Sequence, residues 1–409
     1  TIVRPNMLLS TKNLMGLLVS GISWQLMVQL MNQNLLFLHL VKKRNLKRVE
    51  KVKSKREKVK RKPNSLPQRK LWSLWAMKHS NIAIFIPHVG CPHTCSFCNQ
   101  NTISGAECLP DGNSVREICR NALKEVKSPE NTEIAFFGGS FTAIPRDYML
   151  ELLTAASEFV GEDKFVGIRC STRPDCIDGE VLELLKKYGV TAIELGAQSM
   201  DDTVLEANER GHSAEQVAEA SRLIRKYGFE LGLQMMTGLY ESSPEKDLQS
   251  AVSIAELHPD TVRIYPVAVL NGTKLGQLYQ KGVYKLVPFD EMLSLCGKMI
   301  LMFENCGIKV IKCGLHASEF VENDLLAGYY HPAFRELCEM NIYRELIGCE
   351  LKNADIPKDT VLTVEVSDRC ISKAVGQKKA NIFYFKSLGF NISIVGSNEV
   401  EPFKCKLRR

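Results

Sequence analysis

Three cysteines on one short loop are the residues of this chain best suited to chemistry. Cys91, Cys95 and Cys98 have a C-x3-C-x2-C spacing within the segment VGCPHTCSFCNQ, residues 89–100. A 4Fe-4S cluster normally takes four protein ligands. Three thiolates on one loop would therefore leave one iron open to a substrate or cofactor. The alternative is a zinc site with His93 as fourth ligand, although zinc sites usually take two ligands from a distant part of the chain.

A second group of candidate residues consists of glycines and polar side chains that follow apolar runs. The segment FFGGSFT, residues 136–142, places two adjacent glycines after one run. Because glycine has no Cβ, the backbone there can approach a ligand closely. Other candidates at comparable places are Ser171, Arg173, Gln198, Arg210 and Gln234. Each of these could instead cap a helix or complete a turn.

Apolar periodicity predicts the elements that must position these side chains. Short apolar or β-branched runs indicate strands, and apolar residues at three- and four-residue spacing indicate helices between them. We expect strands at 82–87, 133–137, 165–170, 192–196, 231–236 and 262–266, and helices at 114–126, 147–159, 179–188, 214–227 and 244–257. This alternation predicts an α/β fold, a partial (βα)6 barrel of the TIM type. Sites in such barrels form at the carboxyl ends of the strands.

The cysteine loop, with Phe97 directly before its third cysteine, resembles the signature of the radical S-adenosylmethionine (radical SAM) superfamily. The resemblance implies that Cys91, Cys95 and Cys98 are metal ligands to a 4Fe-4S cluster whose open iron binds S-adenosylmethionine. It also implies reductive cleavage of this cofactor to methionine and a 5′-deoxyadenosyl radical. The residues that it implies for cofactor binding are Phe97, Gly138, Gly139, Ser140, Ser171, Arg173, Gln198, Arg210 and Gln234. Compared with enzymes that resemble the anaerobic coproporphyrinogen oxidase, Ser171 replaces an acidic residue and Gln234 replaces an aspartate.

A narrower resemblance covers most of residues 80–340. The segments ELGAQS (194–199), RGH (210–212), RIYP (263–266), GTKL (272–275) and YYHPAFREL (329–337) are similar to the radical SAM half of the Elongator catalytic subunit. That family carboxymethylates the wobble uridine of tRNA and uses an acetyltransferase domain to deliver acetyl-CoA. Because about 70 residues follow the matching part, we expect no acetyltransferase domain. The resemblance therefore implies the scaffold and an RNA or tRNA substrate, without the same reaction.

The C-terminal residues predict a small α+β domain. Strands are expected at 361–366 and 391–395, with a turn that enters a helix between them at 371–382. This order is similar to a KH-type RNA-binding module, which grips RNA through a G-x-x-G loop. The loop here reads GQKK, residues 376–379, so Lys379 stands in place of the second glycine. The alternative is a structural α+β cap without RNA.

The first 76 residues differ from the rest in charge. They hold 17 Lys and Arg against Glu50 and Glu57, giving +15, whereas residues 77–409 hold 36 basic and 44 acidic residues, giving −8. The whole-chain charge of +7 thus says nothing about a phosphate-binding surface. We expect Met77 to be the natural start, with a membrane anchor at 13–41 or a native basic arm as alternatives. The predicted parts are the atypical extension 1–76, a radical SAM core 77–316 and a C-terminal α+β domain 317–409.

The remaining expectations concern compartment, partners and substrate. All 14 cysteines follow residue 90 and only one group has ligand spacing, so we expect a reducing, cytoplasmic environment. The expected partners are an RNA or tRNA substrate and an electron donor such as ferredoxin or flavodoxin, and no membrane. Two alternatives stay open: the same chemistry on a small molecule, protein or tetrapyrrole, and a non-catalytic RNA-binding protein with a structural metal loop. We assign no catalytic side chain. Tyr265, Tyr330 and His331 could face a substrate, but packing is the commoner role of such residues.

Overall fold

The computed structural model describes residues 80–87, 89, 91, 94–99, 102–103, 108–316 and 318–408. The expected extension at 1–76 and the alternative zinc ligand His93 lie outside these residues. The described residues before 305 and those after 307 belong to one compact unit. No helix of this described part is long and apolar enough to cross a membrane.

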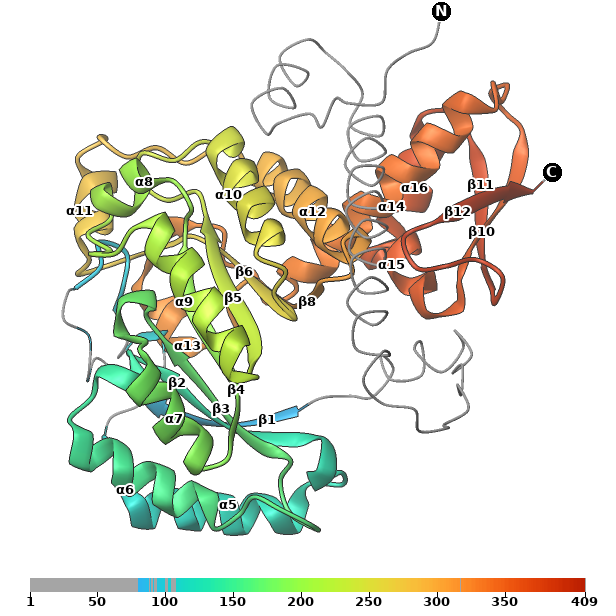
Figure 1. Ribbon diagram of the computed structural model, residues 1–409. Coiled ribbons are helices and arrows are strands. Elements are labelled where there is room, and N and C mark those ends of the chain that lie inside the picture. Colours follow the sequence, from blue (N-terminus) through green and yellow to red (C-terminus); the bar gives the residue numbers. More distant parts are fainter. Residues whose placement is uncertain are drawn as a thin grey trace, which may run out of the picture. The chain divides into compact units, whose positions relative to one another are not determined.

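A parallel sheet of seven strands is the framework of the larger part (Figure 1). The order of the strands follows the chain, β1-β2-β3-β4-β5-β6-β8, as expected when each crossover helix returns the chain to the next strand. The strands are β1 (Ser80–Ile86), β2 (Thr132–Gly138), β3 (Gly167–Thr172), β4 (Val190–Gln198), β5 (Glu230–Thr237), β6 (Thr261–Pro266) and β8 (Lys309–Cys313). The six predicted strands are present, and the α/β fold of the partial-barrel type is confirmed.

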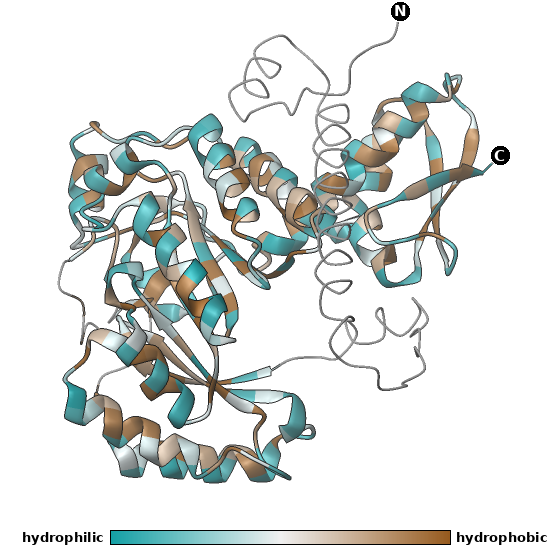
Figure 2. Ribbon diagram, viewed as in Figure 1, coloured by the Kyte–Doolittle hydropathy of each residue, from teal (hydrophilic) through white to brown (hydrophobic). Residues whose placement is uncertain are grey.

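Amphipathic helices connect the strands. They are α5 (Gly112–Glu125), α6 (Arg146–Ser157), α7 (Gly179–Lys187), α8 (Asp202–Ala207), α9 (Ala214–Tyr227), α10 (Pro244–Glu256), α11 (Lys274–Gln280) and α12 (Phe289–Asn305). Figure 2 shows hydrophobic and hydrophilic residues on different sides of several of these helices. The sequence encodes the ends as well: Ser213 and Gln216 form a capping box at the start of α9, and Gly228 ends it in the left-handed conformation. The helices therefore fix where each strand ends.

The seventh strand is the main addition to the predicted framework. β8 has the sequence KVIKC and pairs in parallel with β6, with Lys312 opposite Arg263. The first and last strands of the sheet share no ladder, yet the rings of Phe85 at the end of β1 and His316 just after β8 lie 6.5 Å apart between centroids. The sheet is thus curled enough for its two edges to meet at the carboxyl end. The cysteine loop follows β1 at the same end.

A short antiparallel ladder joins the segments that follow β6 and β8. β7 (Ala268–Leu270) pairs with β9 (Leu325–Gly328), which follows the short helix α13 (Glu319–Asp324). Ala268, Leu270 and Val321 form a small apolar cluster with partly buried neighbours that include Ile103 and Tyr330. This cluster supports the wall of the barrel next to the cysteine loop.

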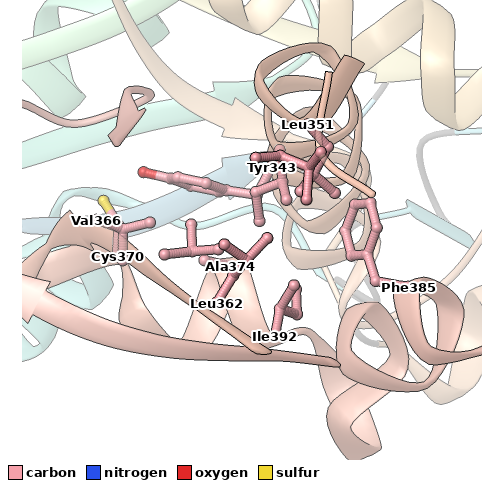
Figure 3. Packing of buried hydrophobic residues seen from close by; sticks show 11 residues of the cluster. Tyr343, Leu351, Leu362, Val366, Cys370, Ala374, Phe385 and Ile392 are labelled. Carbon is pink, nitrogen blue, oxygen red and sulfur yellow. The ribbon is translucent and has the colours of Figure 1, made fainter. Parts of the chain in front are cut away.

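The C-terminal residues form the predicted α+β domain. Its sheet has the order β11-β10-β12, from β10 (Val361–Ser367), β11 (Asn391–Ser397) and β12 (Cys405–Arg408), with β10 parallel to β11 and antiparallel to β12. Its helices are α14 (Phe334–Asn353), α15 (Ile371–Val375) and α16 (Ala380–Ser387). Tyr343 and Leu351 of α14, Phe385 of α16 and the strand residue Leu362 share one buried cluster (Figure 3). The strand β12 and the long helix α14 are additions to the prediction.

Candidate functional site

The cysteine loop is held in place by hydrogen bonds from two distant segments. The Ser96 hydroxyl donates to Oδ1 of Asn208 at 2.8 Å, and the backbone N–H of Ser96 donates to the Asn208 carbonyl at 3.2 Å. The backbone N–H of Leu275, in α11, donates to the Ser96 carbonyl at 2.7 Å. Within the loop, the N–H of Cys98 donates to the Cys95 carbonyl at 3.1 Å. The positions of the thiols are therefore fixed by segments more than 100 residues away in sequence.

One pocket at the carboxyl end of the sheet collects the residues proposed from the sequence. Its volume is about 120 Å³, and we call it the cysteine pocket. The three cysteines and all nine residues that the resemblance assigned to the cofactor line it: Cys91, Cys95, Cys98, Phe97, Gly138, Gly139, Ser140, Ser171, Arg173, Gln198, Arg210 and Gln234. They come from the loop after β1, the ends of β2 to β5 and the turn after α8. Their individual roles toward metal and cofactor stay predictions.

The two glycines after β2 are required by close approach to the cysteine loop. Gly138 has a φ of 114°, and a Cβ there would lie 2.7 Å from the carbonyl oxygen of Ile86. A Cβ on Gly139 would lie 2.5 Å from the carbonyl oxygen of Val89 and 3.4 Å from Sγ of Cys91. Real Cβ atoms do not approach backbone this closely. The pair therefore lets the end of β2 form one wall of the cysteine pocket.

Two arginines place positive charge in the cysteine pocket. Nη1 of Arg210 donates to Sγ of Cys95 at 3.0 Å, and its Nη2 donates to the Gly196 carbonyl at 2.7 Å. Arg173 makes a two-point contact with Asp175, from Nε to Oδ1 at 2.9 Å and from Nη2 to Oδ2 at 2.7 Å. The Arg210 contact therefore places a positive charge beside the sulfur of a predicted metal ligand.

Burial and hydrogen bonding act in opposite directions on the other ionisable groups. Burial raises the pKa of the Cys91 thiol, and a backbone hydrogen bond at Ser140 partly offsets this by favouring the thiolate. Behind the pocket, burial and the charge of Arg210 lower the pKa of His212 to about 4. The Nε2 of His212 lies 3.2 Å from the Ala197 carbonyl. The imidazole is consequently neutral at physiological pH and adds no charge to the pocket.

Two buried polar atoms of the cysteine pocket have no hydrogen-bond partner among the described residues. They are Oε1 of Gln198 and Nε of Arg210. Gln198 also has a φ of 62°, an uncommon backbone conformation for a residue with a side chain. Buried polar atoms almost always have hydrogen-bond partners, so an unpartnered pair in a pocket indicates space for a polar ligand. Together with the glycine wall, these atoms fit a cofactor that carries both donor and acceptor groups.

A buried ionic network lies beneath the pocket on the concave face of the sheet. Arg169 contacts Glu133 at 2.7 Å, Glu230 at 2.8 Å and Glu194 at 3.4 Å. Glu194 also accepts from Nη2 of Arg263 at 2.8 Å and from Nε2 of Gln234 at 2.7 Å. Nε2 of Gln234 also donates to the Ser171 hydroxyl at 3.2 Å, so two side chains hold this amide in position. The network therefore orients Gln234, which was predicted from the sequence.

A second cavity of about 330 Å³ adjoins the cysteine pocket, and we call it the aromatic cavity. Phe97, Cys98, Gly138, Ser171, Gln198 and Gln234 line both. Its remaining walls include Phe85, Phe137 and Tyr265, the basic side chains of Arg263 and Lys312, and the imidazole of His316. Sequence reasoning considered Tyr265 but missed the other five, because β8 was not predicted and Phe85 and Phe137 look like ordinary core residues within apolar runs.

The zinc alternative requires several ligands close enough to share one ion. Within the described ranges, no three His, Cys, Asp or Glu side chains converge closely enough to hold one metal ion. His93 lies outside these ranges, so the ligand roles of Cys91, Cys95 and Cys98 stay predictions.

Comparison with known proteins gives two family matches that together span more than half of the chain. The Radical SAM superfamily model matches residues 85–250, and the Radical_SAM C-terminal domain model matches residues 259–344. The first match starts within β1 and includes the cysteine loop and the ends of β2 to β5. The second begins just before β6 and ends within α14.

Similar sequences and structures agree with these matches. A tRNA uridine(34) acetyltransferase of Dehalococcoides mccartyi is 28% identical over 249 residues, covering 52% of this chain and 54% of that protein. The Elongator complex protein 3 of Saccharomyces cerevisiae is 28% identical over 210 residues, covering 46% of this chain and 38% of that protein. The chain thus spans about half, or less, of the length of these relatives. The fold is similar to the archaeal Elp3 of Methanocaldococcus infernus, with a TM-score of 0.53 and 20% identity over 65% of this chain and 63% of that chain.

Proposed function

We propose that this chain binds a 4Fe-4S cluster and S-adenosylmethionine and modifies RNA, with tRNA as the substrate. The proposal proceeds from its membership of the radical SAM superfamily of enzymes. The observation that carries the cofactor part is the cysteine pocket, in which three thiols, two glycines and seven further predicted residues line one volume. When bound, such a cluster supplies one electron to the sulfonium of S-adenosylmethionine, which releases methionine and a 5′-deoxyadenosyl radical.

The chain's own residues would prepare the pocket in three ways. Cys91, Cys95 and Cys98 would hold three irons, and the Arg210 guanidinium, which donates to Sγ of Cys95 at 3.0 Å, would hold that side chain in place. Gly138 and Gly139 would let the cofactor lie against the backbone of β2. The unpartnered Oε1 of Gln198 would accept a hydrogen bond from the cofactor. The protein thus supplies placement and exclusion of water, which is its usual share in cofactor chemistry.

Anaerobic reconstitution with iron and sulfide tests the cofactor part. We expect about four irons per chain, the broad absorption of a 4Fe-4S cluster and 5′-deoxyadenosine formed only with reductant. The variant Cys95→Ser should lose cluster and product, whereas Cys108→Ser, at an exposed cysteine outside the pocket, should keep both. A colourless protein that holds one zinc would overturn the proposal and favour a structural metal loop.

The RNA part is supported by the names of the relatives and by the turn between α15 and α16. Lys378 and Lys379 are exposed there with φ of 50° and 61°, so two ammonium groups stand on consecutive left-handed residues. This turn occupies the place of the G-x-x-G loop in a KH-type module. The small domain would then hold the RNA while the cysteine pocket acts on it.

Salt-dependent binding of tRNA tests this part. Replacing Lys378 and Lys379 by Ala should weaken binding and lower the slope of log K against log salt by about 1 to 2, because two phosphate contacts are lost. A variant with Lys281 and Lys285 changed to Ala removes the same charge from exposed positions elsewhere. If both variants bind tRNA as the unchanged chain does, or if the unchanged chain binds none, a small molecule, protein or tetrapyrrole becomes the better substrate.

We also propose a low-potential electron donor, such as ferredoxin or flavodoxin, and a cytoplasmic location. All 14 cysteines are free thiols, which fits a reducing compartment. Reduction of the reconstituted cluster by flavodoxin and its reductase, measured as 5′-deoxyadenosine formed, would test the donor. Detection of the protein in the soluble fraction of its host, apart from the membranes, would test the location.

A further inference from the structure

The aromatic cavity contains a lysine for which the described part of the chain supplies no counter-ion. Lys312 lies on β8 directly opposite Arg263 on β6, and both line the cavity. Like charges on facing positions of neighbouring strands destabilise a sheet. Arg263 is neutralised by Glu194, at 2.7 Å. In the described part of the chain, no ion pair joins Lys312 to a carboxylate, and no carboxylate is among the groups that shift its pKa.

The surroundings of Lys312 add positive charge to its own. Its side chain is half-buried, and burial together with the charges of Arg263 and Arg335 lowers its pKa. His316 lines the same cavity after the strand ends, but burial and the charge of Lys312 lower its pKa, which disfavours its charged form. A desolvated ammonium beside further cations is costly unless an anion is supplied. Since the described chain offers none here, the arrangement fits an anion that arrives with the ligand.

Three aromatic residues among those that line the cavity suit a flat apolar group. The rings of Phe85 and Phe137 lie side by side on β1 and β2, 6.4 Å apart between centroids, and Tyr265 lies on β6. The guanidinium of Arg263 lies over the Phe137 ring at 5.1 Å. Aromatic side chains such as these contact planar rings favourably. A volume of about 330 Å³ is at the lower end for small-molecule sites, which limits the occupant to one small group.

The cavity is also in the right place to receive a reacting group. It shares six lining residues with the cysteine pocket, including Cys98 and Gln234, so an occupant would contact a cofactor bound there. We propose that the aromatic cavity is the substrate site, in which Lys312 binds an anionic oxygen group, a carboxylate or a phosphate, and Phe85, Phe137 and Tyr265 contact a planar ring of the same molecule. This inference rests on the proposed radical SAM function and narrows its substrate to planar anions, the class that includes ribonucleotides.

Calorimetry with matched probes tests the inference on the reconstituted full chain. Uridine 5′-monophosphate and uridine form a pair that differs in a phosphate, and orotate and uracil form a pair that differs in a carboxylate. We expect at least one anionic probe to bind about 10- to 100-fold more tightly than its neutral partner, as a charge-assisted hydrogen bond allows. A preference within the uridine pair would identify a phosphate as the anion, and a preference within the orotate pair would identify a carboxylate.

Variants assign the preference to Lys312. Lys312→Ala and the more conservative Lys312→Gln should both remove it, and Lys312→Arg should restore much of it. Lys281→Ala removes one exposed lysine outside the cavity and should leave the preference in place. Equal binding of anionic and neutral probes by the unchanged chain would overturn the inference, as would a preference that survives Lys312→Gln.

A parallel assay separates failure of this inference from failure of the proposed function. Reductive cleavage of S-adenosylmethionine by the unchanged chain is measured without any pyrimidine present. Cleavage without a Lys312-dependent preference would leave the radical SAM chemistry standing and remove the substrate assignment. Lack of cleavage by a fully reconstituted protein would instead remove the function on which the inference rests.

Discussion

The cysteine pocket and the aromatic cavity adjoin at the same end of one sheet but differ in how their positive charges are balanced. In the cysteine pocket, Arg173 pairs with Asp175, and Arg210 contacts the Cys95 thiol and the Gly196 carbonyl. In the aromatic cavity, Lys312 lines the wall with no ion pair to a carboxylate among the described residues. Both arginines of the first site thus have protein partners before a ligand arrives. In the second site, the proposed ligand would supply the missing negative charge.

The largest loss of stability is expected from a substitution of Glu194, which contacts side chains of both sites. Glu194 is 1% exposed and contacts Arg263, Gln234 and Arg169. Glu194→Gln keeps the shape but leaves buried guanidinium charge without its partner, so the free energy of unfolding should fall by about 3 to 5 kcal/mol. Denaturant unfolding under anaerobic conditions measures this.

A surface ion pair provides the matched control for Glu194. Glu158 contacts Arg116 at 2.8 Å with 46% of its side chain exposed. Glu158→Gln should change the free energy of unfolding by no more than about 1 kcal/mol, because solvent screens the pair. If both substitutions lowered the free energy of unfolding by the same amount, the ionic network around Glu194 would not be what joins the two sites.

The contrast between the sites also explains how far the sequence could predict them. The cysteine pocket is encoded by local patterns: C-x3-C-x2-C, Gly138-Gly139 and polar residues at strand ends, all of which fall where parallel strands place their carboxyl ends. The aromatic cavity has no such pattern. Lys312 belongs to the strand KVIKC, whose two lysines make the segment look exposed. Phe85 lies in an apolar run and looks like an ordinary core residue. The hydrogen bonds of Ser96 to Asn208 and Leu275 depend on tertiary packing, which no local pattern reports.

The next effect is a dependence of folding stability on pH, and it concerns the cysteine pocket alone. Burial holds the pKa of His212 at about 4 in the folded chain, below its ordinary value of about 6.5. The folded state thus binds this proton less readily than the unfolded state, and stability is lost as pH falls from about 6.5 to about 4. The shift corresponds to about 3 kcal/mol at most.

The pH effect is measured as a difference between two chains. Urea unfolding between pH 4 and 7 should show a shallower pH dependence for His212→Gln than for the unchanged chain, because the variant lacks the titrating group. Carboxylates titrate in both chains and cancel in the comparison. Identical slopes would show that His212 is protonated equally in both states and that Arg210 does not repel its charge.

A glycine substitution tests how closely the cysteine pocket is packed. Gly139→Ala would place a Cβ 2.5 Å from the Val89 carbonyl oxygen, so the cysteine loop or the end of β2 has to move. We expect the rate of 5′-deoxyadenosine formation to fall by about 100-fold, since a displacement of about 1 Å is enough for such a loss. Gly348→Ala, in α14, meets only one ring atom at 4.0 Å and should leave the rate unchanged while stabilising the helix by up to about 1 kcal/mol.

The smallest effect is expected in the aromatic cavity, at the seam between the first and last strands. Phe85 lies 6.4 Å from Phe137 and 6.5 Å from His316, measured between ring centroids, so Phe85→Leu removes two ring contacts and keeps apolar bulk. The affinity for the preferred pyrimidine probe should fall by about 2- to 10-fold, which matches the worth of aromatic contacts beyond simple burial. Phe383→Leu, at a residue of α16 that is 61% exposed, is the control and should not change it. If Phe85→Leu weakened S-adenosylmethionine binding more than pyrimidine binding, the two cavities would act as one site, and the division between a balanced and an unbalanced site would no longer hold.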